Sequence, residues 1–364
     1  MLKRNDIQFA VNHGTNYLQQ SLAYRFDKPL SKPVEITLAL TRVCPARCVM
    51  CDYWKMQPKD ELTASEWIEF LGQMREWIGP FWVVLSGGEP FIKPGIFDIL
   101  QFCRDNQIKT NVTSNGILLQ PVYLDRILEH GPDFLGLSVD SPRAEVHDAL
   151  RGTPGLHARC AEALHYLRER DKRVVLGVST IIMEDNYREL PDLVHWALNH
   201  GVDRVLFQPL HPKSLFGSAE NDRNWYSKNP HWVQDADAFD HVVEQLLAMK
   251  RDGLPIWNDP NQLQAFKAYL RDPYTHPRPD ECLHRYNAMN VDPQGNVNFC
   301  WILNDPSGNI RQGAPAEIWR SKKAQVVRER MRSCLAPCVL SCNRPRSMAN
   351  QIKLFRFFME RQGT

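Results

Sequence analysis

Short apolar runs alternate with helical patterns along the middle of the chain, from residue 34 to about residue 210. The runs are nearly continuous in aliphatic and aromatic residues, which is typical of strands buried on both faces of a parallel sheet. Between them, apolar residues recur at helical spacing, and a capping box at residues 63–66 marks the start of the first helix. The alternation predicts βα units on a parallel sheet. The six predicted strands are residues 34–40, 81–85, 109–113, 134–139, 174–180 and 204–208.

A long polar stretch at residues 211–235 follows the sixth predicted strand. A loop of this length within a compact domain is usually functional or disordered. Its aromatic residues Trp225, Tyr226 and Trp232 either line a substrate pocket or anchor the loop to the body of the protein. The sequence does not distinguish these two interpretations.

Composition narrows the class of protein. At 364 residues, 43% of them hydrophobic, the chain is long enough for about two domains. A net charge of +2 gives no strong attraction to nucleic acid or anionic membranes, so we expect no nucleic-acid partner. The N-terminus is too polar to begin a signal peptide, and no apolar stretch approaches the roughly 20 residues of a transmembrane span. Ten cysteines without a secretion signal favour metal ligation over disulfides, which predicts a cytoplasmic protein.

Three cysteines, Cys44, Cys48 and Cys51, follow the first predicted strand with the spacing C-x3-C-x2-C. Cysteine thiolates are the usual ligands of iron–sulfur clusters. Three of them on one short loop can bind three irons of one cube, which leaves the fourth iron for a ligand that is not protein. A structural zinc site would close with a fourth ligand nearby, and this loop offers none. The alternatives are a zinc site or three unrelated thiols.

The second predicted strand ends in Ser86, Gly87, Gly88, Glu89 and Pro90. Two glycines let the backbone approach a ligand without interference from a Cβ atom. The carboxylate of Glu89 adds an acceptor suited to an ammonium group. On its own this segment is a common kind of turn, but one strand after the cysteine loop it is a specific signal.

Together these two motifs resemble those of the radical S-adenosylmethionine (radical SAM) superfamily. The resemblance implies an α/β fold, a partial (β/α)6 TIM-type barrel with SAM at the C-terminal ends of the strands. It also implies that Cys44, Cys48 and Cys51 hold a [4Fe-4S] cluster whose open iron is chelated by the amino and carboxylate groups of SAM.

The resemblance further implies that Gly87, Gly88 and Glu89, together with Pro90, form the site for the methionine amino group of SAM. The family usually has an aromatic residue before the third cysteine, and this chain has Met50. Because methionine is a soft, adaptable apolar side chain, we expect Met50 to pack beside the nucleoside in place of the aromatic ring.

Polar residues stand at the ends of the later predicted strands. By their position in the family, Ser138 and Thr180 are candidates to contact the ribose or the methionine carboxylate of SAM. Ser114 is a further candidate for the SAM site, while Asp140 and Gln208 are expected to face SAM or substrate. The alternative for each is a turn or cap residue.

Five more cysteines stand in the C-terminal part: Cys282, Cys300, Cys334, Cys338 and Cys342. Residues 291–300 predict a β-hairpin, and a basic helix is predicted at about 316–332. The end of the hairpin and the C-x3-C-x3-C cluster after the helix can meet at one site. Four cysteines there suit zinc or an iron–sulfur cluster, and the sequence barely separates the two.

The cysteine spacing in this region resembles the SPASM and shorter twitch extensions of radical SAM enzymes, which carry auxiliary [4Fe-4S] clusters. Two clusters ligated fully by cysteine would need eight ligands, so five support one cluster with one cysteine spare, or a second cluster with other ligands. We expect one auxiliary cluster on Cys282 and Cys300 with two of Cys334, Cys338 and Cys342.

The expected organisation has five segments. They are an N-terminal extension at 1–33, the radical SAM barrel at 34–215, connecting loop and helices at 216–280, the SPASM- or twitch-like auxiliary-cluster domain at 281–345, and a tail at 346–364.

The resemblance implies that SAM is cleaved reductively to methionine and a 5′-deoxyadenosyl radical, which abstracts hydrogen from a substrate. An electron donor such as flavodoxin or ferredoxin is the expected partner. The substrate is either a small molecule that is oxidised or rearranged, or a ribosomal peptide that is crosslinked or epimerised. Few residues precede Cys44, too few for the leader-recognition domain of many peptide maturases, which favours a small molecule. A non-catalytic iron–sulfur or zinc protein is the rival from another class, and it predicts no SAM binding.

Overall fold

The computed structural model describes residues 15–16, 18–171, 174–212, 222–275, 282–336 and 338–339. These residues build one sheet of nine strands in the order β6-β5-β4-β3-β2-β1-β7-β8-β9. Strands β1 to β6 run parallel to their neighbours. The strands are β1 (Glu35–Ala39), β2 (Trp82–Ser86), β3 (Lys109–Ser114), β4 (Phe134–Ser138), β5 (Val175–Ile182), β6 (Arg204–Pro209), β7 (Ala288–Val291), β8 (Asn296–Asn298) and β9 (Gly308–Asn309).

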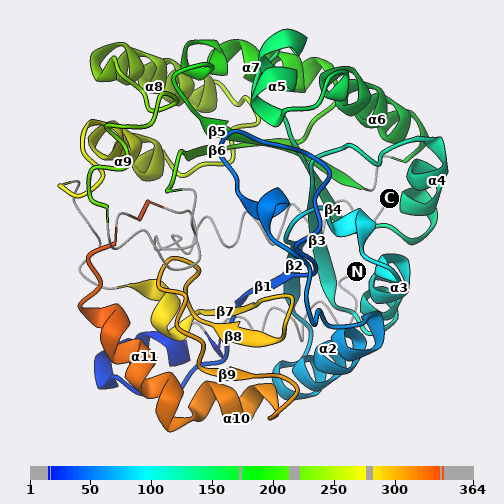
Figure 1. Ribbon diagram of the computed structural model, residues 1–364, viewed down its shortest axis with the longest axis vertical. Helices are drawn as coiled ribbons and strands as arrows, with labels where there is room; N and C mark the ends of the chain where they lie inside the picture. The colour runs from blue at the N-terminus through cyan, green and yellow to red at the C-terminus, as the bar shows by residue number, and fades with distance from the viewer. Residues whose placement is uncertain are drawn as a thin grey trace.

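Helices form an arc outside the curved parallel sheet (Figure 1). The α-helices are α2 (Ala64–Ile78), α3 (Ile96–Asp105), α4 (Pro121–His130), α5 (Ala144–Arg151), α6 (Leu156–Arg170), α7 (Leu190–Asn199), α8 (Ala236–Arg251), α9 (Pro260–Arg271), α10 (Pro315–Arg320) and α11 (Lys322–Arg332). Short 3-10 helices are η1 (Tyr53–Lys55), η2 (Pro90–Ile92), η3 (Tyr187–Glu189) and η4 (Leu283–Tyr286). The six predicted parallel strands and the partial barrel are confirmed. The barrel stays open because β6 and β9 are the two edges of the sheet.

The two faces of the parallel strands differ in burial. In β2, Val83 and Leu85 are fully buried, while Val84 between them is only partly buried. In the second half of β5 the same alternation buries Val178, Thr180 and Ile182 and leaves Ser179 and Ile181 partly buried. Since successive side chains of a strand point to opposite faces, the fully buried set faces the helices and forms the core. The partly buried set faces the concave side of the open barrel.

The C-terminal part continues this sheet instead of forming a separate one. Strand β7 pairs in parallel with β1, and β8 and β9 follow in antiparallel order. The predicted hairpin is confirmed. Its turn places Gly295 at φ +86°, in the left-handed region that favours glycine, and the Gly295 N–H donates to the Asp292 carbonyl at 2.9 Å.

The prediction of one helix at about 316–332 is wrong. The segment forms two helices, α10 and α11, separated at Ser321. The backbone of Ser321 is extended, with ψ 156°, and its hydroxyl accepts a hydrogen bond from Ala324 N–H at 3.0 Å. Ser321 therefore acts as the N-cap of α11, a local choice that the apolar periodicity does not reveal.

The aromatic residues of the long polar stretch anchor it to the barrel. Trp232 is buried, and its ring centroid lies 5.6 Å from that of Tyr269 on α9. Trp225 and Tyr226 pack against Trp232, with ring centroids 5.2 Å from it in both cases. These contacts support the anchoring interpretation. Among the helices that the structure describes, none has both the length and the apolar character to span a bilayer.

Candidate active site

The three cysteines of the N-terminal loop lie together where the chain leaves β1. Cys48 is buried, and Cys44 and Cys51 are partly buried. The pKa of the Cys44 thiol is raised to about 12, mainly by burial and further by the charges of Cys48, Glu89 and Cys51. Three thiolates this close repel one another, so a bound metal cluster that supplies positive charge is what makes the thiolate forms favourable.

Each of the three sulfurs has a hydrogen-bond donor. The contacts are Asn115 Nδ2 to Cys44 Sγ at 3.4 Å, Arg151 Nη1 to Cys48 Sγ at 3.9 Å, and Tyr53 N–H to Cys51 Sγ at 3.4 Å. Donors to the ligand atoms are a common outer shell of metal sites and hold the ligands in place. The residues present therefore fit an iron–sulfur cluster bound by three thiolates.

The glycines after β2 are required by the neighbouring backbone. A Cβ atom on Gly87 would lie 2.6 Å from the Thr41 carbonyl oxygen, and one on Gly88 would lie 2.2 Å from that of Val43. Gly88 N–H donates to Thr41 at 2.8 Å, and Glu89 N–H donates to Val43 at 2.9 Å. The close approach predicted from the glycines is thus an approach to the start of the cysteine loop. The two motifs are fixed against each other through backbone contacts.

The carboxylate of Glu89 is the centre of this junction. It is fully buried, and burial raises its pKa to about 7 although it accepts hydrogen bonds. Oε1 accepts from Ser114 Oγ at 2.9 Å and from Phe91 N–H at 3.2 Å, and Oε2 accepts from Asn115 N–H at 2.9 Å. A carboxylate offers about four acceptor positions, so one remains for an ammonium group. Pro90, also buried, begins η2 directly after it.

Asn115 links Glu89 to the cysteine loop. Its backbone N–H binds Glu89, its side-chain amide donates to Cys44 Sγ, and its Oδ1 accepts from Ile117 N–H at 2.8 Å. From the end of this strand, only Ser114 was predicted as a site residue. Asn115 could have been predicted because it follows Ser114 and β3 is the neighbour of β2, which leads into the Gly-Gly-Glu-Pro segment.

The strand-end residues separate into two groups by the face on which they lie. Ser138 and Gln208 are partly buried on the concave side, and the register pairs Ser138 with Ser179. Ser114 and Thr180 lie on the helix-facing side and are buried. The Thr180 hydroxyl donates to the Val139 carbonyl at 2.6 Å. Ser179, the neighbour of Thr180, is therefore the residue that shares a face with Ser138.

Asp140, which was expected to face SAM or substrate, is fully buried, and its carboxylate pairs with the guanidinium of Arg151. Met50 is partly buried and packs against the core. No local sequence pattern singles out Arg151.

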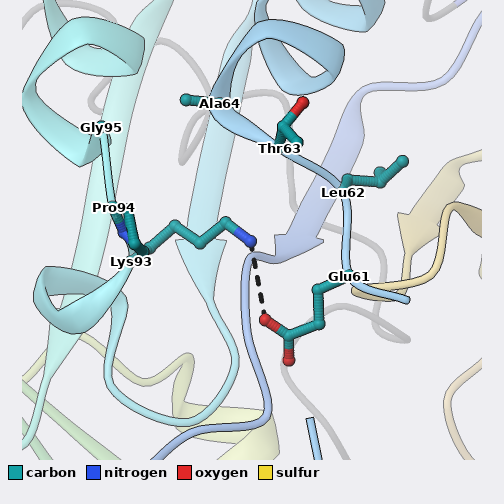
Figure 2. A pocket seen from close by; sticks show the side chains of 7 residues that line it. All are labelled: Glu61, Leu62, Thr63, Ala64, Lys93, Pro94 and Gly95. Atoms are coloured by element: carbon teal, nitrogen blue, oxygen red, sulfur yellow. Dashed lines mark ion pairs between the residues drawn. The ribbon is translucent and has the colours of Figure 1, made fainter. Parts of the chain in front are cut away.

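A cavity of about 400 Å³ lies beside the start of the cysteine loop, lined by residues 61–64 and 93–95. Figure 2 shows the side chains of Lys93 and Glu61 pointing toward each other there, with Nζ and Oε2 3.5 Å apart. Lys93 is buried, and Glu61 Oε1 accepts from Arg42 N–H at 2.6 Å. This ion pair ties the segment after Pro90 to the cysteine loop.

The described C-terminal cysteines converge from three segments. The pKa of the Cys282 thiol is raised to about 12, mainly by burial and also by the charges of Cys300 and Cys334. Burial likewise raises the pKa of Cys300 to about 12, with contributions from Cys338 and Cys334. Cys342 lies outside the described residues.

Within the described residues, no three Cys, His, Asp or Glu side chains lie close enough together to hold one metal ion.

Comparison with known proteins matches family models to the barrel with its cysteine loop and to the C-terminal cysteine region. Residues 38–197 match the family model described as the radical SAM superfamily, and residues 282–343 match SPASM, an iron–sulfur cluster-binding domain. Together the two models cover more than half of the chain.

Relatives match over most of the chain. The AdoMet-dependent heme synthase of Methanosarcina barkeri is 27% identical and aligns with 82% of this chain and 84% of its own length. The PqqA peptide cyclase of Rhodopseudomonas palustris is 26% identical, over 80% of this chain and 74% of its own. The crystal structure of Streptococcus suis SuiB bound to S-adenosylmethionine has the same fold, with a TM-score of 0.66 and 17% identity over 86% of this chain and 70% of that chain.

The two domains imply the cofactors expected from the sequence: a [4Fe-4S] cluster, SAM and auxiliary iron–sulfur ligation. The resemblance of the sequence motifs is confirmed. The chain belongs to the radical SAM superfamily and carries a SPASM domain in its C-terminal part.

Proposed function

We propose that this radical SAM enzyme cleaves SAM reductively and abstracts hydrogen from a small-molecule or natural-product substrate, which is then oxidised or rearranged. A [4Fe-4S] cluster held by the three thiolates would supply the one electron for this cleavage, which would give methionine and a 5′-deoxyadenosyl radical. The electron comes from a low-potential donor such as flavodoxin or ferredoxin. The observation that carries the proposal is the backbone junction between the three-cysteine loop and the Gly87–Glu89 segment.

In this proposal Cys44, Cys48 and Cys51 are the cluster ligands. The segment Gly87–Pro90 holds the amino group of SAM, with the remaining acceptor position of Glu89 directed at the ammonium. Because a buried Glu89 has a raised pKa, a neighbouring ammonium also favours its charged form.

The other predicted SAM contacts divide by face. Ser138 and Gln208, on the concave side, are the candidates for direct contact with SAM, and Met50 packs beside the nucleoside. Ser114 and Thr180 support the site from behind, because both are buried on the helix-facing side. For Ser114 the support is its hydrogen bond to Glu89.

Cys282 and Cys300 are proposed to hold one auxiliary [4Fe-4S] cluster together with two of Cys334, Cys338 and Cys342. The charge effects of Cys334 and Cys338 on the pKa of Cys300, and of Cys300 and Cys334 on that of Cys282, support a common site. The auxiliary cluster would accept the electron of an oxidised product or anchor the substrate.

The small-molecule assignment draws support from the heme synthase of Methanosarcina barkeri, which aligns over most of both chains. A second candidate, maturation of a ribosomal peptide, is favoured by the PqqA peptide cyclases and by SuiB, whose structure with the precursor peptide SuiA has the same fold.

The test is anaerobic reconstitution with iron and sulfide, reduction with dithionite, and quantification of 5′-deoxyadenosine after SAM is added. We expect nucleoside from the wild type and none from Cys48→Ala. No nucleoside above background from protein with an intact cluster would reject the proposal. Deuterium transfer into 5′-deoxyadenosine from a deuterated heme precursor supports the small-molecule assignment, whereas transfer from a deuterated precursor peptide supports the second candidate.

A further inference from the structure

We infer that Arg151 is a positioning residue for the N-terminal cluster: its guanidinium, held by Asp140, lies against Cys48 Sγ and stabilises the reduced state of the cluster. The inference rests on the proposed function, because it takes Cys48 as a cluster ligand. Three observations support it: α5 ends against the cysteine loop, Asp140 holds the guanidinium of Arg151, and the remaining nitrogen of that guanidinium faces Cys48 Sγ.

Helix α5 ends against the cysteine loop. The last carbonyls of a helix have no partner within it. Here Leu150 C=O accepts from Val49 N–H at 2.9 Å, and Arg151 C=O accepts from Arg47 N–H at 3.1 Å. These two amides flank Cys48 on both sides. The loop therefore caps the helix, and the helix fixes the backbone position of Cys48.

The contact leaves no space for a side chain at the helix end. Gly152 has φ +61°, and a Cβ atom there would lie 2.6 Å from the Arg47 carbonyl oxygen. Glycine takes this left-handed conformation without penalty. The end of α5 and the loop are thus in direct backbone contact, which brings the Arg151 side chain to the cysteine.

The guanidinium of Arg151 is directed by Asp140. Arg151 is 7% exposed and Asp140 is 0% exposed. Arg151 Nε lies 2.6 Å from Asp140 Oδ2, and Nη2 donates to Oδ1 at 2.9 Å. The remaining nitrogen, Nη1, is 3.9 Å from Cys48 Sγ. Two of the three nitrogens face the carboxylate, and the third faces the sulfur.

Asp140 is in turn held by three other segments. Its Oδ1 accepts from Ile181 N–H at 3.0 Å, its carbonyl accepts from Asn186 Nδ2 at 2.7 Å, and its N–H donates to His147 Nδ1 at 3.1 Å. The barrel, not the loop, therefore sets the orientation of Arg151. A buried ion pair is weak support for stability, so a role in function is the better account of this one.

The charges predict opposite effects for the two partners. Each electron added to a cluster makes it more negative, and a cation beside a ligand sulfur favours that state. Hydrogen bonds to the sulfurs and local charge are known controls of cluster potential. Loss of the Arg151 charge should lower the midpoint potential. Loss of the Asp140 charge leaves the guanidinium uncompensated and should raise it.

The test uses the reconstituted full chain and EPR-monitored redox titration of the signal that responds to SAM. We expect Arg151→Gln to shift the midpoint potential to more negative values and Asp140→Asn to shift it to more positive values. A residue that acted only through stability would not move the potential in two directions. The matched control is Arg168→Gln, which removes the partly buried Arg168–Asp203 ion pair on α6 and should leave the potential unchanged.

Unchanged potentials in both variants, or shifts of the same sign, would overturn the inference. If Arg151→Gln does not retain iron, Asp140→Asn decides alone: a rise supports the inference and the absence of a rise overturns it. Failure of the proposed function is distinct, since it would appear as wild-type protein that makes no 5′-deoxyadenosine.

Discussion

The two cysteine sets of this molecule are built in different ways. The N-terminal set lies on one loop, and side chains from other elements, Asn115 and Arg151, reach two of its sulfurs. The described C-terminal cysteines come from three segments, and their sulfurs accept hydrogen bonds from backbone amides close by in sequence, such as Ala336 N–H to Cys334 Sγ at 3.4 Å. Side chains of the barrel thus contact the sulfurs of the first set, whereas backbone amides of the cysteine-bearing loops contact those of the second.

This difference bears on how each set depends on its metal. The barrel holds the N-terminal loop through backbone contacts to the end of β2 and to α5. The C-terminal cysteines come from segments that are distant in sequence, and Gln262 Nε2 on α9 donates to the Val339 carbonyl beside Cys338 at 3.2 Å. Where ligands come from separate segments, metal binding contributes to folding. We therefore expect the C-terminal site to be the one that loses order without iron.

The largest effect is expected from removal of the N-terminal thiolates. Cys44→Ala/Cys48→Ala/Cys51→Ala should reduce 5′-deoxyadenosine formation to background, because no cluster remains to reduce SAM. The iron content should fall from about eight to about four atoms per chain, since the C-terminal cluster persists. Iron analysis and the nucleoside assay measure both. An iron-free triple variant would contradict the proposed auxiliary cluster.

The next effect is expected at the junction of the two motifs. Gly88→Ala places a Cβ atom 2.2 Å from the Val43 carbonyl oxygen, so the loop must move. Overpacking of this kind costs about 1–3 kcal/mol, and we expect the rate of 5′-deoxyadenosine formation to fall at least about tenfold. The control is Gly72→Ala within α2, where the nearest atom, Phe102 Cζ, is 3.6 Å away. Equal rates for the two variants would show that the junction does not position the loop.

Loss of a C-terminal ligand should separate SAM cleavage from product formation. Cys300→Ala is expected to lose the auxiliary cluster and the product while still forming 5′-deoxyadenosine, because the N-terminal loop is held by the barrel. Iron analysis, nucleoside assay and mass spectrometry of the substrate measure the three quantities. If cleavage also stops while the N-terminal cluster remains intact, the two sets are not independent.

The smallest effect concerns the ion pair between Glu66, on α2 of the barrel, and Arg311, which follows β9 in the C-terminal part. Hydrogen bonds from Arg311, and next from Thr63 N–H, lower the pKa of Glu66 to about 2, from 4.5. A carboxyl whose folded-state pKa is lowered stabilises the protein above its unfolded value, and this contribution is lost as the pH falls from about 4.5 toward about 2. Glu66→Gln should cost about 0.2–1 kcal/mol at neutral pH.

Denaturant titration of Glu66→Gln and wild type at neutral pH and near pH 3 checks this prediction. The difference in the free energy of unfolding should shrink at the lower pH. A difference that stays constant with pH would show that the ion pair between Glu66 and Arg311 contributes nothing to stability.

The sequence predicted what depends on local pattern. Strands buried on both faces leave continuous apolar runs, so all six parallel strands were located, and the cysteine spacing located both metal regions. The break at Ser321 was missed because serine is common inside and outside helices. The facing of Ser114 and Thr180 depends on register, and the role of Asn115 and Arg151 depends on contacts between elements distant in sequence. No local pattern carries that information.

The central claim is that the N-terminal cluster alone has an iron open to SAM. Electron–nuclear double resonance of the reduced protein, with SAM labelled with ¹⁵N in its amino group and ¹⁷O in its carboxylate, tests it directly. The account predicts hyperfine coupling from both labels in the wild type and none in the variant that lacks Cys44, Cys48 and Cys51. Absence of coupling in wild-type protein with both clusters intact, or coupling that persists in the variant, would contradict it.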